Sequence, residues 1–374
     1  MDFCISEKVI IFDTEIIQLH KGEKWITISE IVCDTIVANG EATSLDGKWL
    51  MKDNRLVFID KQLAGIRLFS LDGAYLGRHI NRGRGPNEVL SPFHDADYVN
   101  DDSFVAIGQG WFLYLFDSLF TMKREPYSFY KSIEQSMSMD AKNHLLKHPD
   151  PKDEQMYEFN YAQCKQIKYI DNKLLMSIVT EHISYNGYFT NARSKEFYRD
   201  SYLYLFLNFD NWSMGKMFGH YPPVYYKKNI PAFSKYNIDI FDNKIFTAFE
   251  ADSLIYVRDN NGVLMYSLGF RAPCISNGYP ETRTIEEHDA FVRMRKKEFG
   301  HYSDIKIVNG YLFRSYQKRD HLGYGLQIYL EDNLIGDITL TESLKIIGGY
   351  DGYFYGELPV DLENECFRIL KFKL

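Results

Sequence analysis

Residues 53–58 read Asp53-Asn54-Arg55-Leu56-Val57-Phe58, a pair of turn-forming residues followed, after one variable residue, by three strand-forming residues. The pattern returns five more times, starting at the pairs Asp101-Asp102, Asp171-Asn172, Asp242-Asn243, Asn309-Gly310 and Asp351-Gly352. Asn-Gly and Asp-Gly pairs tolerate the positive φ angles of two-residue hairpins, and Asp-Asn pairs do so less well. Each copy therefore predicts a turn between two antiparallel strands.

A second turn follows most copies. Residues 65–69 lead through Ser70-Leu71-Asp72-Gly73 into another strand, and residues 254–257 do so through Asp259-Asn260-Asn261-Gly262. The repeating unit is thus four strands joined by tight turns, which is the meander of one propeller blade. The second turn residues, at positions 54, 102, 172, 243, 310 and 352, are 48, 70, 71, 67 and 42 residues apart. The shortest intervals match a blade of ~40–50 residues.

The longer intervals contain insertions of polar or helical composition at residues 129–160, 180–200 and 271–301. We therefore predict an all-β fold: one six-bladed β-propeller domain over residues 1–374 with four-stranded antiparallel blades. The predicted blades cover residues 47–80, 94–127, 162–218, 236–270, 302–340 and 343–374.

The last predicted blade has only three obvious strands, and an unpaired edge is a liability that sheets usually cover. Residues 26–37, rich in Ile, Thr and Val, precede the first blade. We expect this segment to supply the missing strand and close the ring.

One helix is expected, at residues 284–299 in the last insertion. Thr284 and Glu287 form a capping-box pair, and basic residues gather toward the other end. Ile285, Val292 and Phe299 recur every seven residues, with Phe291 and Met294 nearby. This spacing predicts one apolar stripe that docks on the ring.

Composition narrows the classes of function. The net charge of −8 argues against a nucleic-acid surface, which needs a basic stripe. No run of ~18 apolar residues occurs, so we expect no transmembrane helix. The five cysteines include no Cys-x-x-Cys pair and the ten histidines no His-Glu-x-x-His spacing. We therefore expect neither a metal site nor a cofactor.

The junction of the first two blades resembles a known family. Residues 68–77 form a blade turn that leads into Asn81-Arg82-Gly83-Arg84-Gly85-Pro86-Asn87-Glu88. Together they are similar to the Phe-Asp-x-x-Gly turn and Gly-x-Gly-Pro-x-Glu motif of bacterial six-bladed β-propellers, which are like NHL-repeat and TolB-type domains. The resemblance implies an exported lipoprotein or periplasmic protein without an assigned reaction.

The first eight residues lack the features of a secretory signal. We expect a periplasmic or outer-membrane-anchored lipoprotein if an export signal has been removed, and a cytoplasmic protein if this N-terminus is native.

Three groups of residues are candidates for ligand binding. Arg82 and Arg84 suit binding of carboxylate or phosphate groups. With Glu88, they either lie on one face of the ring as a binding site or belong to a segment that only connects one blade to the next. His94 starts an inner strand near the central channel. Tyr221, Tyr225 and Tyr226 belong to a Tyr/Pro loop that suits either recognition of a sugar, peptide or protein, or packing between blades.

No nucleophile elbow or phosphate loop is present in the sequence, so no catalytic residue is assigned. We expect a non-catalytic protein of the bacterial cell envelope that binds a small molecule, a glycan or a protein. Two alternatives remain open: a hydrolase or lyase with its site at the channel mouth, and a structural subunit of an envelope complex.

Overall fold

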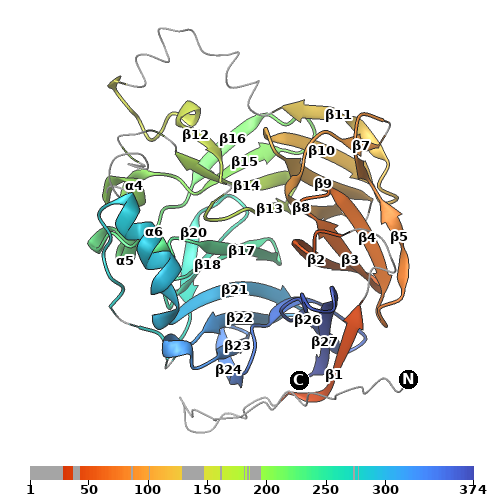
Figure 1. Cartoon of the computed structure of the whole chain (residues 1–374). Coiled ribbons are helices and arrows are strands. Elements are labelled where there is room, and N and C mark those ends of the chain that lie inside the picture. The colour runs from red at the N-terminus through yellow and green to blue at the C-terminus, as the bar shows by residue number, and fades with distance from the viewer. Residues whose placement is uncertain are drawn as a thin grey trace.

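The computed structural model describes residues 28–36, 43–85, 87–100, 102–128, 147–160, 162–180, 182, 185, 195–272, 274–276 and 278–374. Six antiparallel sheets are arranged in a ring around a central axis (Figure 1). The predicted six-bladed β-propeller of four-stranded blades is confirmed.

Five blades follow one another along the chain. The first contains β2 (Gly47–Lys52), β3 (Arg55–Asp60), β4 (Gly65–Ser70) and β5 (Tyr75–His79). The second contains β8 (Phe93–Asn100), β9 (Ser103–Gly108), β10 (Phe112–Asp117) and β11 (Met122–Ser128). The third has its inner strand split into β12 (Tyr157–Phe159) and β13 (Ile167–Ile170), followed by β14 (Lys173–Thr180), β15 (Tyr204–Asn208) and β16 (Met214–Phe218). The fourth contains β17 (Tyr236–Phe241), β18 (Lys244–Phe249), β19 (Ile255–Arg258) and β20 (Leu264–Leu268). The fifth contains β21 (His301–Val308), β22 (Tyr311–Gln317), β23 (Tyr324–Leu330) and β24 (Asn333–Leu340).

The sixth blade joins the two ends of the described chain. Its strands β25 (Lys345–Tyr350), β26 (Tyr353–Glu357) and β27 (Phe367–Lys373) are completed by β1 (Ser29–Ile36), which pairs antiparallel with β27. The rings of Phe58 and Phe367, from the first and sixth blades, pack with centroids 4.4 Å apart. The expected closing strand is confirmed; residues 26, 27 and 37 of the predicted segment lie outside the described residues.

The predicted turn pairs lie between the first and second strands of the blades; Asp101, in the second pair, lies outside the described residues. The other five are two-residue hairpins, because the residues flanking them are direct partners, as in Ile170↔Lys173 and Val308↔Tyr311. Both residues of Asp242-Asn243 and of Asn309-Gly310 have φ angles between 50° and 82°, which explains why turn-forming residues occupy these positions.

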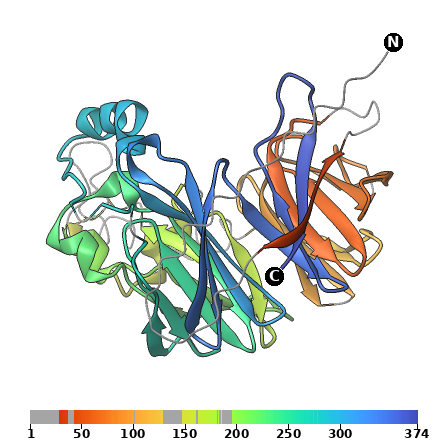
Figure 2. The same cartoon turned by 90° about the horizontal axis from the view of Figure 1, so that it is seen from below.

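The two faces of the ring differ because of this topology. In a four-stranded meander, the turns after the first and third strands lie on one face, and the connections after the second and fourth strands lie on the other. The tight turns occupy the former face. The latter carries the helices α4 (Lys195–Asp200), α5 (Pro223–Lys227) and α6 (Ile285–Met294), which rise on one side of the ring in Figure 2. We call this the insertion face. Residues 129–146 and most of 181–194, which belong to predicted insertions, lie outside the described residues.

The predicted helix begins at Thr284, whose hydroxyl accepts from the Glu287 N–H at 3.2 Å, and continues past α6 as a 3-10 turn at Lys296–Glu298. Only part of its predicted stripe docks. Phe291 and Phe299 pack on each other with centroids 5.5 Å apart, whereas Val292 and Met294 are exposed. The seven-residue spacing was wrong for Val292, since the buried face of the helix passes through its neighbour Phe291, and Met294 is exposed where the α-helix ends. The helices α4 and α5 were not predicted. Within the described residues, no helix is long and apolar enough to cross a membrane.

Candidate functional site

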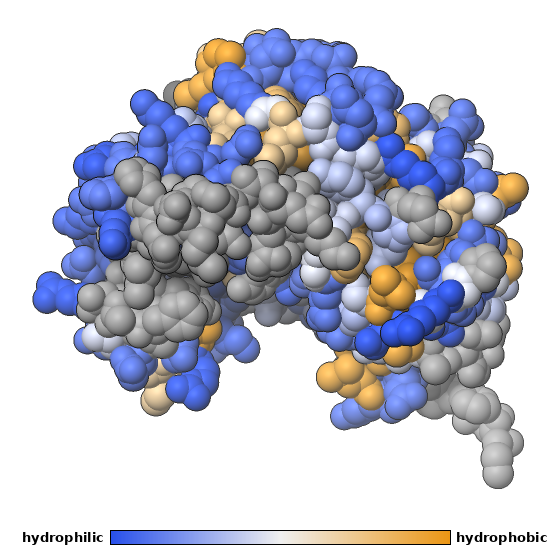
Figure 3. Space-filling model, turned by 90° about the horizontal axis from the view of Figure 1, so that it is seen from above, coloured by the Kyte–Doolittle hydropathy of each residue, from blue (hydrophilic) through white to orange (hydrophobic). Residues whose placement is uncertain are grey.

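A cavity of about 340 Å³ lies on the ring axis, at the ends where the inner strands begin. Residues at or just before the starts of β2, β13, β17, β21 and β25 line it, together with Asp95 of β8. These strand starts belong to the insertion face, where Figure 3 shows the molecule hollowed by a broad notch. The cavity therefore opens on the face that carries the inserted connections between strands.

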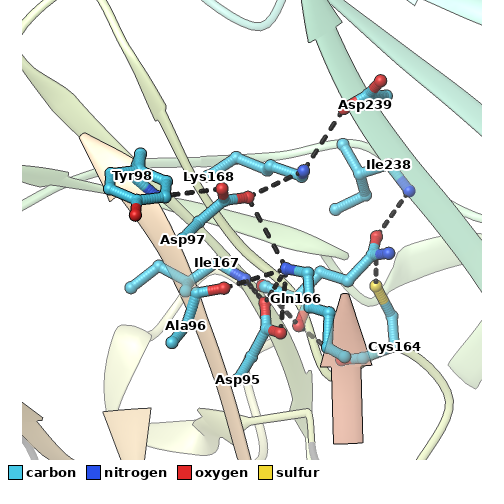
Figure 4. Close-up of polar contacts among 12 residues, drawn as sticks. Asp95, Ala96, Asp97, Tyr98, Cys164, Gln166, Ile167, Lys168, Ile238 and Asp239 are labelled. Atoms are coloured by element: carbon cyan, nitrogen blue, oxygen red, sulfur yellow. Dashed lines mark hydrogen bonds and ion pairs between the residues drawn. The ribbon is translucent and has the colours of Figure 1, made fainter. Parts of the chain in front are cut away.

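A chain of ion pairs forms the floor of this cavity. Lys48 pairs with Asp95 at 3.0 Å and reaches Asp97 at 3.6 Å. Lys168 pairs with Asp97 at 2.8 Å and with Asp239 at 3.2 Å, and Figure 4 shows it between the two carboxylates. Lys306 follows, 3.4 Å from Asp239. We call the set Lys48, Asp95, Asp97, Lys168, Asp239 and Lys306 the ion-pair belt; it connects the first five blades.

Backbone contacts hold the belt in register. Asp95 accepts a hydrogen bond from the Ile167 N–H of the next blade at 2.9 Å, and Asp239 accepts one from the Ile307 N–H at 2.7 Å. Gln166 plays the same part between the third and fourth blades by accepting from the Ile238 N–H at 2.6 Å. The side chain of one inner strand thus ties down the backbone of the next.

The charges of the belt stabilise one another. Burial alone would raise the pKa of Asp97, but Lys168 and Lys48 outweigh it and hold that pKa well below its usual value. Burial likewise would lower the pKa of Lys168, yet Asp97 and Asp239 hold it above its usual value. Asp97 and Lys168 are therefore both ionised at neutral pH.

Four further lysines, Lys61, Lys165, Lys235 and Lys345, surround the cavity mouth. Among the described residues, none of their ammonium groups has a hydrogen bond or ion pair. The pKa of Lys61 is lowered chiefly by burial, with Lys48 and Lys165 adding to the effect and Asp95 opposing it. We call these four side chains the mouth lysines.

Two carboxyl groups face the same cavity from the fifth and sixth blades. Burial raises the pKa of Asp304 to about 6, although Lys345 opposes the rise. Burial also raises the pKa of Glu357, and the neighbouring Asp304 adds to this. Glu357 lies directly opposite Lys345 in the β25–β26 pair.

The inserted helix is anchored at the cavity wall. Lys296, just beyond α6, donates to both carboxylate oxygens of Glu250, at 2.9 and 3.0 Å. Burial lowers the pKa of the adjacent His301, so its imidazole is neutral at pH 7. The buried Glu250 carboxylate is thereby neutralised by the helix end.

The predicted residues Arg82, Arg84 and Glu88 lie apart from this cavity. They belong to the connection between β5 and β8, where the short strands β6 (Asn81–Arg82) and β7 (Glu88–Val89) pair at the outer rim (Figure 1). Glu88 accepts a hydrogen bond from the Gly85 N–H at 2.6 Å, while Arg82 and Arg84 are exposed. This geometry matches the chain-carrying interpretation, and no described contact joins these residues to the channel.

His94 is half-buried on β8 and its ring lies 5.8 Å from that of Phe159. It is not among the residues that line the cavity. Burial lowers its pKa, and the neighbouring Lys165 and Lys61 lower it further. The alternation expected along this strand instead directs the next residue, Asp95, into the channel.

The Tyr/Pro loop is mostly core. Tyr221 and Tyr225 are buried, and their hydroxyls donate to the carbonyls of Ser234 and Phe233 at 2.9 and 2.7 Å. Tyr226 is partly buried against the same cluster. These contacts correspond to the packing alternative. The rings of Tyr221 and Tyr225 have almost no solvent-exposed surface.

Sequence reasoning missed the belt and the mouth lysines. One signal could have revealed part of the belt: Lys168, Asp239 and Lys306 each lie four residues before the second residue of a turn pair. Opposite charges at one position of successive repeats indicate facing side chains. No cluster of three or more potential metal ligands occurs within the described part of the chain.

Comparison with known proteins identifies the fold but no family. No family model and no curated relative matches the chain. A member of the DUF4221 family from Bacteroides vulgatus superposes with a TM-score of 0.67 at 10% identity, over 94% of this chain and 99% of that one. A protein from Bacteroides fragilis, inferred to be exported, superposes with a TM-score of 0.54 at 13% identity, over 94% of this chain and 98% of that one. At such low identity the likeness extends to architecture alone: the chain is a six-bladed β-propeller similar to these two bacterial proteins.

Proposed function

We propose that this chain is a non-catalytic binding protein of the bacterial cell envelope, and that its ligand enters the channel mouth on the insertion face. The observation that carries this proposal is a polar cavity lined by lysines that form no ion pair within the described part of the chain. Its floor is fixed by the ion-pair belt, and its mouth holds the mouth lysines. A preformed concave site with a few convergent polar groups is the usual form of a ligand pocket.

A cysteine in the cavity lining supports a non-catalytic role. Cys164 lines the cavity, but burial raises the pKa of its thiol far above the usual value. A thiol that stays protonated is a poor nucleophile. Within the described residues, the His94 imidazole is not part of the cavity lining and cannot serve there as its base.

The envelope assignment draws on two supports: the resemblance at residues 68–88 and the exported neighbour from Bacteroides fragilis. Kinship with NHL- and TolB-like propellers and attachment through a lipid are parts of the same proposal.

Filling the cavity tests the proposal. Ser303 lines it and is exposed on β21, so Ser303→Trp adds bulk there without removing a side-chain contact. The matched control is Ser118→Trp, at an exposed turn on the opposite face. In a thermal-shift screen of saccharides, peptides and organic acids, ligands of the wild type should lose at least tenfold in affinity with Ser303→Trp and none with Ser118→Trp. Equal binding by both variants would refute a ligand site in the channel.

A hydrolase or lyase is the second candidate, favoured by Asp304 and Glu357, because raised carboxyl pKa values in one cavity suit general acid catalysis. Turnover of a chromogenic glycoside or ester panel that is abolished by both Asp304→Asn and Glu357→Gln would establish it. Activity that survives both changes would exclude these residues as the catalytic pair.

A further inference from the structure

We infer that the cavity takes a small acidic molecule carrying at least two negative groups, either a polycarboxylate or an organic phosphate, held by Lys61, Lys165 and Lys235. The inference rests on the proposed function, because it assigns a ligand class to the same cavity.

The residues that line the cavity carry an excess of positive charge, whereas the net charge of the protein is negative. The chain has 43 basic and 51 acidic residues. The cavity lining instead contains seven lysines (Lys48, Lys61, Lys165, Lys168, Lys235, Lys306 and Lys345) against five acidic residues (Asp95, Asp239, Glu250, Asp304 and Glu357). Since the pKa values of two of these acids are raised, the positive excess grows below neutral pH. A concave site of one sign concentrates ligands of the opposite sign.

The backbone fixes Lys61 at the mouth. Its N–H donates to the Asp46 carbonyl at 3.0 Å, and its carbonyl accepts from the Phe93 N–H at 2.8 Å. Lys61 is partly buried, and its ammonium group forms no ion pair with a carboxylate among the described residues. A charge held in this way loses hydration without gaining a partner, and an anion that binds there supplies one.

Two acids of the cavity lining, Asp95 and Glu250, are already paired with other lysines. Lys48 donates to both oxygens of Asp95, at 3.0 and 3.2 Å, and Asp95 also accepts from a backbone N–H. Lys296 donates to both oxygens of Glu250, one of which also accepts from the Lys235 backbone N–H at 3.3 Å. Glu357 influences Lys61 electrostatically but forms no ion pair with it.

The three lysines belong to three different blades. Lys61 follows β3, Lys165 precedes β13 and Lys235 precedes β17, so their positive charges approach the mouth from separate sides. One negative group cannot satisfy lysines on separate sides, whereas a molecule with two or three can. A volume of about 340 Å³ is at the small end of ligand pockets, which suits a molecule of metabolite size.

Isothermal titration calorimetry at pH 7 and low salt tests the inference, with citrate and pyrophosphate as the two acidic probes and glucose as the neutral one. Lys61→Gln and Lys165→Gln should each weaken binding of the preferred acid at least tenfold, and the preference between the probes separates carboxylate from phosphate ligands. The control Lys244→Gln makes the same charge change on the face of the tight turns and should leave affinity within twofold.

Lys165 is exposed, so its replacement keeps the test valid even if Lys61→Gln folds poorly. Equal weakening by Lys165→Gln and Lys244→Gln would overturn the inference, as would an affinity for both acids no greater than for glucose. If glucose or another neutral ligand binds and Ser303→Trp blocks it, the proposed function stands and only the acidic ligand class fails. If acids bind equally well to Ser303→Trp, both fail.

Discussion

Replacing Lys168 with methionine removes one ammonium group from the ion-pair belt while keeping the length of the side chain. Lys168 is 11% exposed and lies within 3.2 Å of carboxylate oxygens of both Asp97 and Asp239. Asp97 would keep Lys48, at 3.6 Å, and the Tyr98 N–H, at 2.9 Å. Asp239 would keep Lys306, at 3.4 Å, and the Ile307 N–H, at 2.7 Å. Breaking a buried pair from one side costs about 3–5 kcal/mol, because a charge stays buried without its partner.

This cost converts into a measurable shift. A folded chain of 374 residues unfolds with an entropy of roughly 0.8 kcal/mol/K, at about 2.1 cal/mol/K per residue. Lys168→Met should therefore lower the melting temperature by about 4–6 °C at pH 7, measured by differential scanning calorimetry. The control Lys244→Met removes an exposed pair with Asp242, at 3.7 Å, and should cost less than about 1 °C.

The pH dependence has a definite sign. In the wild type the pKa of Asp97 is depressed, so its contribution to stability is present above its usual pKa and is lost as the pH falls toward the folded-state value. In Lys168→Met the Asp97 carboxylate has lost its nearest ammonium group, so its pKa is less depressed and it takes up a proton more easily. The gap between the two melting temperatures should then narrow from pH 7 to pH 4. A gap below 1 °C at pH 7, or one that widens in acid, would refute the belt as an ionised network.

Three further predictions concern the rest of the ring. The pKa of Asp304 is about 6 in the folded protein and 3.8 in the unfolded chain, so ionising this carboxyl group destabilises the fold, by at most about 3 kcal/mol once the pH has risen above both values. Asp304→Asn should therefore raise the stability of the protein to urea at pH 8 but not at pH 4. An equal gain at both pH values would contradict this. Deleting residues 1–40 removes β1 and should prevent cooperative unfolding, as followed by circular dichroism, whereas an unchanged melting temperature would show that blade six closes without it. Gly83→Ala places a Cβ 2.0 Å from a Glu88 oxygen and should cost about 1–3 kcal/mol by displacing that carboxylate from the Gly85 N–H, with citrate affinity unchanged; a loss of affinity would connect the outer rim to the ligand site.

The fold could be predicted because its strongest signals are local. A two-residue hairpin depends on the two residues within it, so Asn309-Gly310 and Asp351-Gly352 reveal their turns without knowledge of the rest of the chain. Ring closure could be predicted by counting strands, since the last predicted blade lacked one strand and the predicted strand at residues 26–37 lacked a partner. The docking of the helix was harder to predict, because Val292 is at the expected seven-residue spacing and yet is exposed, whereas its neighbour Phe291 is buried.

The candidate site could not be found in the same way because its parts meet only across blades. Lys61 and Lys235 are 174 positions apart and belong to connections with no local motif. A lysine in a polar connection is most often simply solvated, and nothing near Lys61 in the sequence indicates that Asp95 is already engaged by Lys48. The position of His94 at the start of an inner strand predicts a place at the channel, whereas its neighbour Asp95 is the residue that lines the cavity.

Lysine footprinting gives the most direct view of where an acid binds. The native protein would be acylated briefly with and without saturating citrate or pyrophosphate, and each lysine's modification quantified by mass spectrometry. We predict that the probe protects Lys61, Lys165 and Lys235 severalfold and leaves Lys244 unchanged. Protection of Lys244 to the same degree, or none at the three mouth positions while the acid is bound, would contradict a ligand site at the channel mouth.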